Sequence, residues 1–143
     1  MKRIFLELTD YSIRAVNSSW WRQIMALFLK PGAPFEIRCW REETELIRQA
    51  LAFGSLSQDR STDYEVSVTG VLTDPMISAL LNAGPPAGAE QMVRFFTISS
   101  GHIWSAHYGT QLVISGASEA ELRSVEAVLS PLKEYFSCIE EDV

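Results

Sequence analysis

The stretch VRFFTISSGHIWSAHYGTQLVIS, residues 93–115, decides the fold class of this chain. It contains three short runs rich in β-branched and aromatic residues, at 93–99, 102–107 and 110–115. Gly101 and Gly109, which separate the runs, reach the positive φ angles that tight hairpin turns need. The stretch therefore predicts three antiparallel strands in sequence order, a β-meander.

Three segments upstream of the meander alternate between apolar and polar residues, at 2–9, 35–40 and 64–69. A period of two residues is typical of strands with one buried face. In the first segment Ile4, Leu6 and Leu8 share one face, and Phe5 lies on the other. With the meander, these segments predict about six strands.

Helical spacing of apolar residues marks three other segments, at 17–29, 46–51 and 76–82. Asp74 and Pro75 supply an N-cap and a proline at the first helical position for the last of them. Residues 13–16 fit either an extension of the first helix or a strand paired with residues 2–9, and the sequence does not decide between them. Residues 55–63 read as a polar surface loop.

A fourth helix is predicted after residue 118, where Ser118 and Glu121 have the spacing of a capping box. Its core-facing stripe is expected to contain Leu122, Val125, Leu129, Leu132 and Phe136. Ser130-Pro131 interrupts this stripe, because proline removes a backbone hydrogen bond, and predicts a kink or a restarted helix.

The length and composition predict one α+β domain over residues 1–143, with a mixed or antiparallel sheet packed by three to four helices. A chain of 143 residues buries a single core well, and 47% hydrophobic with 21% charged residues is ordinary for a globular protein. The longest apolar run, residues 24–29, is far shorter than a bilayer crossing, so we expect a cytoplasmic protein that does not bind membranes. Cys39 and Cys138 lie in apolar surroundings, which favours reduced, buried thiols.

No motif for catalysis, metal binding or a cofactor stands out, and the sequence favours a non-catalytic protein. His102 and His107 are five residues apart, a spacing that sends side chains to opposite faces of a strand, so we expect one packed and one partly exposed histidine. An alternative is a small-molecule-binding domain or enzyme with a pocket near Trp104, His107 and Tyr108. A structural adaptor subunit is a further alternative.

Negative charge concentrates at the end of the chain. Residues 117–143 contain seven acidic and two basic residues, and so carry five of the six net negative charges. We expect an acidic outer face on the last helix that ends in Glu140-Glu141-Asp142. Such a face either keeps the protein soluble or steers a basic protein partner. Nucleic acid is disfavoured as a partner, because 12 basic residues face 18 acidic ones.

Trp20 and Trp21 are adjacent, and on a narrow helical stripe both cannot point inward. An exposed member of the pair would be a candidate anchor in a protein interface, where tryptophan is over-represented. The alternative is core packing on both sides of a sandwiched helix.

In its size, its acidity and its Glu140-Glu141-Asp142 end, the chain resembles the immunity proteins of bacterial toxin systems, such as those of contact-dependent growth inhibition. The resemblance implies a protein that binds a cognate toxin, often a basic nuclease, and blocks its active site by charge and shape complementarity. We also expect the chain to be a monomer or homodimer. The candidate partner-binding residues are Glu134, Glu140, Glu141, Asp142, Trp20 and Trp21.

Replacing Glu134, Glu140, Glu141 and Asp142 by their neutral isosteres is expected to slow association with a basic partner and to flatten its salt dependence. The free energy of unfolding should change little, because exposed charges contribute little to it. Stopped-flow association at several salt concentrations measures the first effect, and denaturant titration the second. An unchanged association rate would mean that the charge serves solubility alone.

Overall fold

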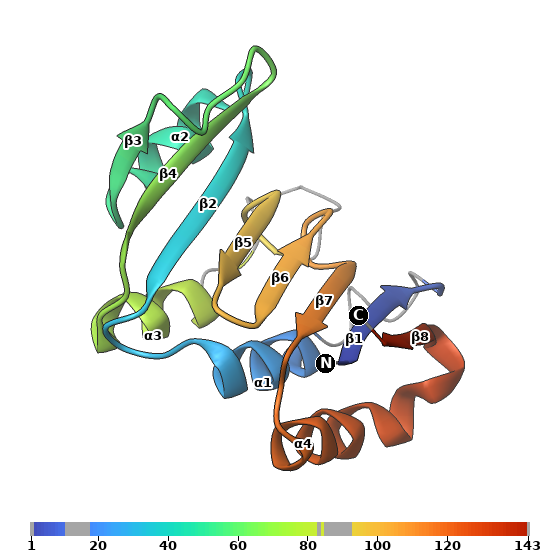
Figure 1. The fold of residues 1–143 in the computed structure, drawn as a ribbon. Helices are drawn as coiled ribbons and strands as arrows, with labels where there is room; N and C mark the ends of the chain where they lie inside the picture. The colour runs from blue at the N-terminus through green and yellow to red at the C-terminus, as the bar shows by residue number, and fades with distance from the viewer. Residues whose placement is uncertain (1, 11–17, 83, 85–92, 143) are drawn as a thin grey trace.

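In a computed structural model the chain forms one antiparallel sheet with helices on a single face (Figure 1). The structure describes residues 2–10, 18–82, 84 and 93–142. Its strands are β1 (Lys2–Leu8), β2 (Pro34–Trp40), β3 (Ser55–Ser57), β4 (Glu65–Val71), β5 (Thr97–Ser100), β6 (Ile103–Ala106), β7 (Gln111–Ser115) and β8 (Phe136–Asp142). Its helices are α1 (Ser19–Phe28), α2 (Thr44–Ala50), α3 (Asp74–Asn82), α4 (Glu119–Leu129) and the 3-10 helix η2 (Ser130–Tyr135).

The strand order is β3-β4-β2-β5-β6-β7-β1-β8, and every neighbouring pair is antiparallel. The predicted α+β class is confirmed, and of the two sheet types left open the antiparallel one is present. The sheet has eight strands within the described residues rather than about six. The two additional strands are β3, in the segment expected to be a loop, and β8, in the segment expected to be helical.

The β-meander is confirmed. β5, β6 and β7 pair in sequence order, and Gly101 and Gly109 have φ angles of 56° and 87° in the two turns. β5 begins at Thr97, later than the sequence pattern suggested. His107 and Tyr108 also have positive φ angles, of 49° and 57°, so they lie in the turn between β6 and β7.

The end of the chain differs from the predicted long helix. The capping box of Ser118 and Glu121 is present and α4 begins as expected. α4 ends at Leu129, and η2 then begins with Pro131 in its first turn, where the missing N–H costs nothing. From Phe136 the chain is a strand, because seven consecutive residues pair with β1 and satisfy their backbone groups there.

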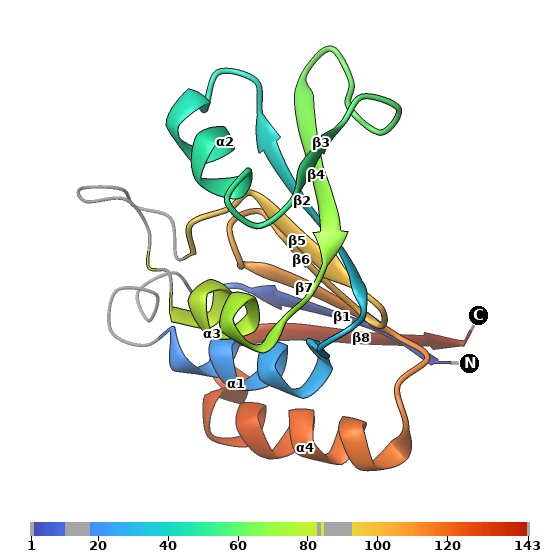
Figure 2. The same ribbon diagram turned by 90° about the vertical axis from the view of Figure 1, so that its left-hand side faces the viewer.

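All four α-helices lie on one face of the sheet, which we call the inner face (Figure 2). α1 lies between α3 and α4, the two helices that it contacts. The strands contribute alternate residues to the core, with Ile37, Leu6 and Leu112 among those almost fully buried. The opposite, outer face of the sheet has no helix over it among the described residues.

Trp20 and Trp21 are both buried, each only 1% exposed. Of the two alternatives, core packing on both sides of a sandwiched helix is confirmed, because α1 has neighbours on several sides and its buried arc is wide enough for two adjacent large side chains. The assignment of Trp20 and Trp21 as partner-binding residues is wrong. Trp21 donates its indole N–H to the Ser105 hydroxyl at 3.0 Å, and the Trp20 ring packs edge-to-face on Phe136 at 4.6 Å. Neither tryptophan can therefore anchor a partner.

Residues 13–16, for which the sequence left two structures open, lie outside the described part of the chain. None of the helices in the described residues is long and apolar enough to cross a membrane.

Ser105→Ala is expected to lower the free energy of unfolding by about 1–3 kcal/mol, because it leaves the buried indole N–H of Trp21 without its acceptor. Ser99→Ala is the matched control, since Ser99 lies on the neighbouring strand but on the outer face. The control should change the unfolding free energy by less than about 0.5 kcal/mol. Urea denaturation of both variants measures the difference, and equal effects would contradict this role of the hydrogen bond.

Candidate protein-binding surface at the sheet edge

The strand β8 forms one edge of the sheet and carries the acidic end of the chain. It pairs with β1 from Leu8↔Phe136 to Lys2↔Asp142, and no strand of the described residues pairs with its other side. Glu140, Glu141 and Asp142 are all exposed. Three of the four predicted partner-binding acids are thus brought together on one strand, whereas the exposed Glu134 precedes them in η2.

The alternation of β8 divides its side chains between two faces of the sheet. Glu140 lies opposite Ile4 and Cys138 opposite Leu6, and both therefore belong to the inner face. Glu141 and Ile139 belong to the outer face. An ion pair of 3.3 Å joins Glu141 to Arg3, but both partners are well exposed, so this pair stabilises the fold little.

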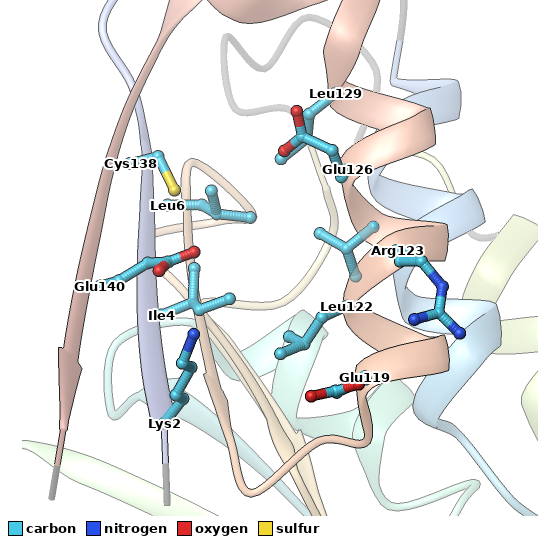
Figure 3. A pocket seen from close by; sticks show the side chains of 11 residues that line it. Lys2, Ile4, Leu6, Glu119, Leu122, Arg123, Glu126, Leu129, Cys138 and Glu140 are labelled. Carbon is cyan, nitrogen blue, oxygen red and sulfur yellow. The ribbon is translucent and has the colours of Figure 1, made fainter.

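A hollow of about 360 Å³ opens between α4 and the strands β1 and β8 on the inner face (Figure 3). Its apolar walls come from Ile4, Leu6, Leu122, Val125, Leu129 and Cys138. Its charged groups are Lys2, Glu119, Arg123, Glu126 and Glu140. Glu126 is held by Lys133 at 2.7 Å. With Lys133 included, three carboxylates and three cations meet at this rim. Apolar walls beneath carboxylates can take a long basic side chain, whose stem is apolar and whose head is charged.

On the outer face an apolar row continues inward from β8. Ile139, Phe5, Val113 and Trp104 lie opposite one another on β8, β1, β7 and β6. Ile139 is 59% and Trp104 46% exposed. Two hollows, of about 270 and 350 Å³, open along this row and share Phe5, Val113 and Trp104. We call these four residues the apolar row.

Sequence reasoning did not identify the apolar row as a functional surface. Part of the row could have been found from the sequence, because the period of two in residues 2–9 places Phe5 on the other face of the strand from the core residues Ile4 and Leu6. Ile139 could not be found this way, because the pattern around it predicted a helix. Trp104 was a candidate residue, but for a different site.

The hollows beside Trp104 give no support to a pocket shared by Trp104, His107 and Tyr108. Trp104 lies on the outer face, and neither hollow beside it is lined by the other two residues. Tyr108 donates its hydroxyl to Glu43 at 2.9 Å and packs against Phe96. Burial, together with the hydrogen bond and negative charge of Glu43, raises the pKa of Tyr108 well above its usual value.

The His107 ring packs edge-to-face on Phe96 at 5.5 Å between centroids, but His102 and His107 are both exposed, so the expectation of one packed histidine is met only in part. The reason is that both lie in the turns that flank β6 and neither lies on the strand itself. In the part of the chain that the structure describes, no three histidine, cysteine or acidic residues are grouped so that they could hold a metal ion.

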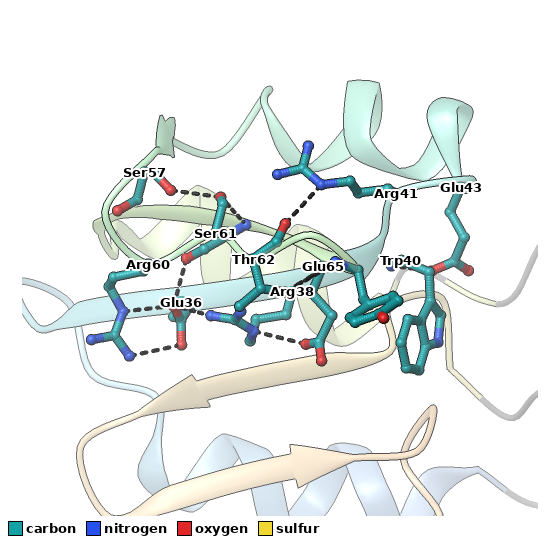
Figure 4. A network of polar contacts seen from close by, with 12 residues as sticks. Glu36, Arg38, Trp40, Arg41, Glu43, Ser57, Arg60, Ser61, Thr62 and Glu65 are labelled. Atoms are coloured by element: carbon teal, nitrogen blue, oxygen red, sulfur yellow. Dashed lines mark hydrogen bonds and ion pairs between the residues drawn. The ribbon is translucent and has the colours of Figure 1, made fainter.

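A polar network covers the outer face at the opposite end of the sheet (Figure 4). Glu36 accepts hydrogen bonds from Ser67, from Arg38 at 3.1 Å and from Arg60 at 2.7 Å, and Arg38 also donates to Glu65 at 2.8 Å. Burial acts to raise the pKa of Glu36, but these hydrogen bonds and the two guanidinium charges outweigh it and hold the pKa below its usual value. The charges of this network serve to join β2, β4 and the loop before β4.

The two cysteines have different environments. Cys39 is buried as expected, and burial together with the charge of Glu43 raises the pKa of its thiol to about 12. Cys138 is exposed, contrary to expectation, because β8 lies at the sheet edge and the hollow leaves its inner side open. Both are free thiols.

Comparison with known proteins finds no match: no family model, no curated protein and no solved structure is similar to this chain.

A maleimide is expected to modify Cys138 in the native protein at pH 8 and to leave Cys39 unmodified until the protein unfolds. Partial burial and the nearby carboxylates of Glu140 and Glu126 raise the pKa of Cys138, so its reaction should quicken further above pH 9. Mass spectrometry of the labelled protein counts the modified thiols, with Cys138→Ser as the control that takes no label. A native protein in which Cys138 takes no label would contradict the exposure of β8, and one in which Cys39 is labelled would contradict the burial of that thiol.

Proposed function

We propose that this chain is a non-catalytic protein-binding domain that neutralises a basic, nuclease-type bacterial toxin by binding it directly. The observation that carries the proposal is the position of Glu140, Glu141 and Asp142, which are exposed together on an edge strand and lie next to an exposed apolar row. This combination supports an interface with a charged rim and an apolar centre.

The acidic edge would act first, during encounter. A nuclease carries cations where it holds the phosphates of its substrate, and negative charge on β8 attracts those cations over several ångströms. Occupying them would remove the toxin's ability to bind nucleic acid. Stoichiometric inhibition of this kind needs no catalytic group, which agrees with the absence of a catalytic motif from the sequence.

The apolar row would then hold the complex. Trp104 and Phe5 are aromatic, partly exposed and in contact with the two hollows of the outer face. Burial of such side chains at the centre of an interface contributes most to slow dissociation. Trp104 therefore takes the anchoring role that the sequence had suggested for Trp20 or Trp21.

The test uses bacteria that express the product of the gene immediately upstream, the place expected for a cognate toxin. Co-expression of the native chain should restore growth. The variant Glu140→Gln, Glu141→Gln, Asp142→Asn should protect poorly, because it removes three negative charges from β8. Growth rate after induction is the measurement.

The matched control is Glu42→Gln, Asp59→Asn, Asp63→Asn, which removes three exposed negative charges elsewhere on the molecule. It should protect as well as the native chain. An upstream product that is harmless, or whose toxicity the native chain does not relieve, contradicts the proposal. Equal protection by the two variants shows that β8 is not the contact surface.

A further inference from the structure

We propose that β8 receives an extended basic segment of the partner as a ninth strand of the sheet. This inference rests on the proposed protein-binding function and specifies how the partner docks. It combines three features of the described residues: a long open edge, an alternating acidic pattern and the hollow between β8 and α4.

The open edge of β8 is long enough to hold a strand. An antiparallel strand directs half of its backbone N–H and C=O groups to each neighbour, and β1 uses only one side of β8. The other side presents a row of donors and acceptors over a strand of seven residues. The opposite edge of the sheet, β3, has only three residues and offers far less. Strand addition to an exposed edge is an established mode of peptide binding.

The side chains of β8 define the chemistry of the added strand. Glu140 and Asp142 share the inner face, so the residues opposite them would be lysine or arginine, since opposite charges stabilise cross-strand pairs. Between them on the outer face lies Glu141, which already contacts Arg3. Opposite Ile139, a β-branched apolar residue would extend the apolar row by one strand. The partner segment is thus one that alternates basic and apolar residues.

The hollow beneath β8 gives the basic side chains a place to lie. Figure 3 shows Glu140 projecting from β8 on the side that faces α4. A lysine opposite Glu140 would extend under β8, with its stem against Leu6 and Leu122 and its ammonium group near the carboxylates of Glu119 and Glu140. A short polar side chain would not reach the leucines and the carboxylates together, so the hollow favours a long basic side chain.

The same acids disfavour a second copy of this chain as the occupant. Pairing of β8 with β8 of another molecule would bring six carboxylates to one interface, and like charges across strands are destabilising. The acidic pattern therefore protects the edge from self-association and selects for basic segments. A partner segment is the occupant that the charge favours.

The first experiment uses a capped seven-residue peptide with lysine at positions 1 and 3 and valine or threonine elsewhere. Positions 1 and 3 lie opposite Asp142 and Glu140 when the peptide is antiparallel to β8. We expect binding that protects amide hydrogens of β8 from exchange, measured by NMR. Moving the lysines to positions 2 and 4 keeps the composition but should weaken binding about tenfold, because the charges then face Ile139 and Glu141.

Backbone methylation of the peptide tests the main-chain pairing directly. One peptide is N-methylated at its odd positions and a second at its even positions, so that only one of them blocks the edge that faces β8. One peptide should bind at least about tenfold more weakly than the parent, and the other about as tightly. If the two methylated peptides bind equally tightly, or if both lose the same affinity relative to the parent peptide, strand addition is wrong.

Two proline variants test the edge from the protein side. Cys138 and Ile139 are adjacent, so one directs its N–H to β1 and the other to the open edge. Of Cys138→Pro and Ile139→Pro, one should unfold at lower urea and the other should keep its stability but lose peptide binding at least about tenfold. Cys138→Ala and Ile139→Thr, which keep the amide, are the controls and should bind within about twofold of the native chain.

The outcomes separate this inference from the proposed function. If the stable proline variant still binds the peptide or still protects cells, strand addition is wrong while the protein-binding function stands. If the native chain does not protect cells, the proposed function is wrong, and the methylated peptides still decide strand addition. Protection of β8 amides that rises with the concentration of the protein alone would show that a second copy occupies the edge, and would overturn the inference.

Discussion

The pairing of β1 with both β7 and β8 is the interaction on which the rest of the structure depends. β1 joins the meander to the end of the chain, and its inner side chains Ile4, Leu6 and Leu8 lie in the core. Without β1, β8 would have no partner, and the acids of the chain end would not be held on a strand. The surface that we propose for partner binding is therefore a direct product of this strand's central position.

The outer face of the sheet differs between its two halves, although the core on the inner face is continuous. Near β2 and β4 the outer face is covered by the polar network around Glu36, whose charges are paired with one another. Near β1, β6, β7 and β8 it shows the apolar row instead. A network of satisfied charges stabilises the sheet itself, whereas partly exposed aromatic side chains gain most from contact with another molecule.

Short stretches of sequence were sufficient to predict some elements of this structure and insufficient to predict the others. Gly101 and Gly109 determine turns between neighbouring strands, so the meander could be predicted from a few residues. β8 could not, because its conformation is set by pairing with a strand at the other end of the chain, and Pro131 alone did not reveal a strand beyond the helix. Likewise the burial of Trp20 and Trp21 depends on how many elements surround α1, which a helical period does not reveal. The acidic residues at the end of the chain could be identified from the charge distribution of the sequence. Their arrangement on an edge strand could not be predicted from it.

The distance along the chain between β1 and β8 also affects how this protein folds. Pairing Leu8 with Phe136 closes a loop that contains nearly all of the chain, and the entropy lost in such a closure has to be offset before the pair gains any contact. Proteins rich in pairings of this kind fold slowly, and their non-local strands join late. The meander, which needs only short loops, can form much earlier. A newly made molecule therefore displays its acidic edge only once the rest of the sheet is in place, so that the partner binding that we propose would report completed folding.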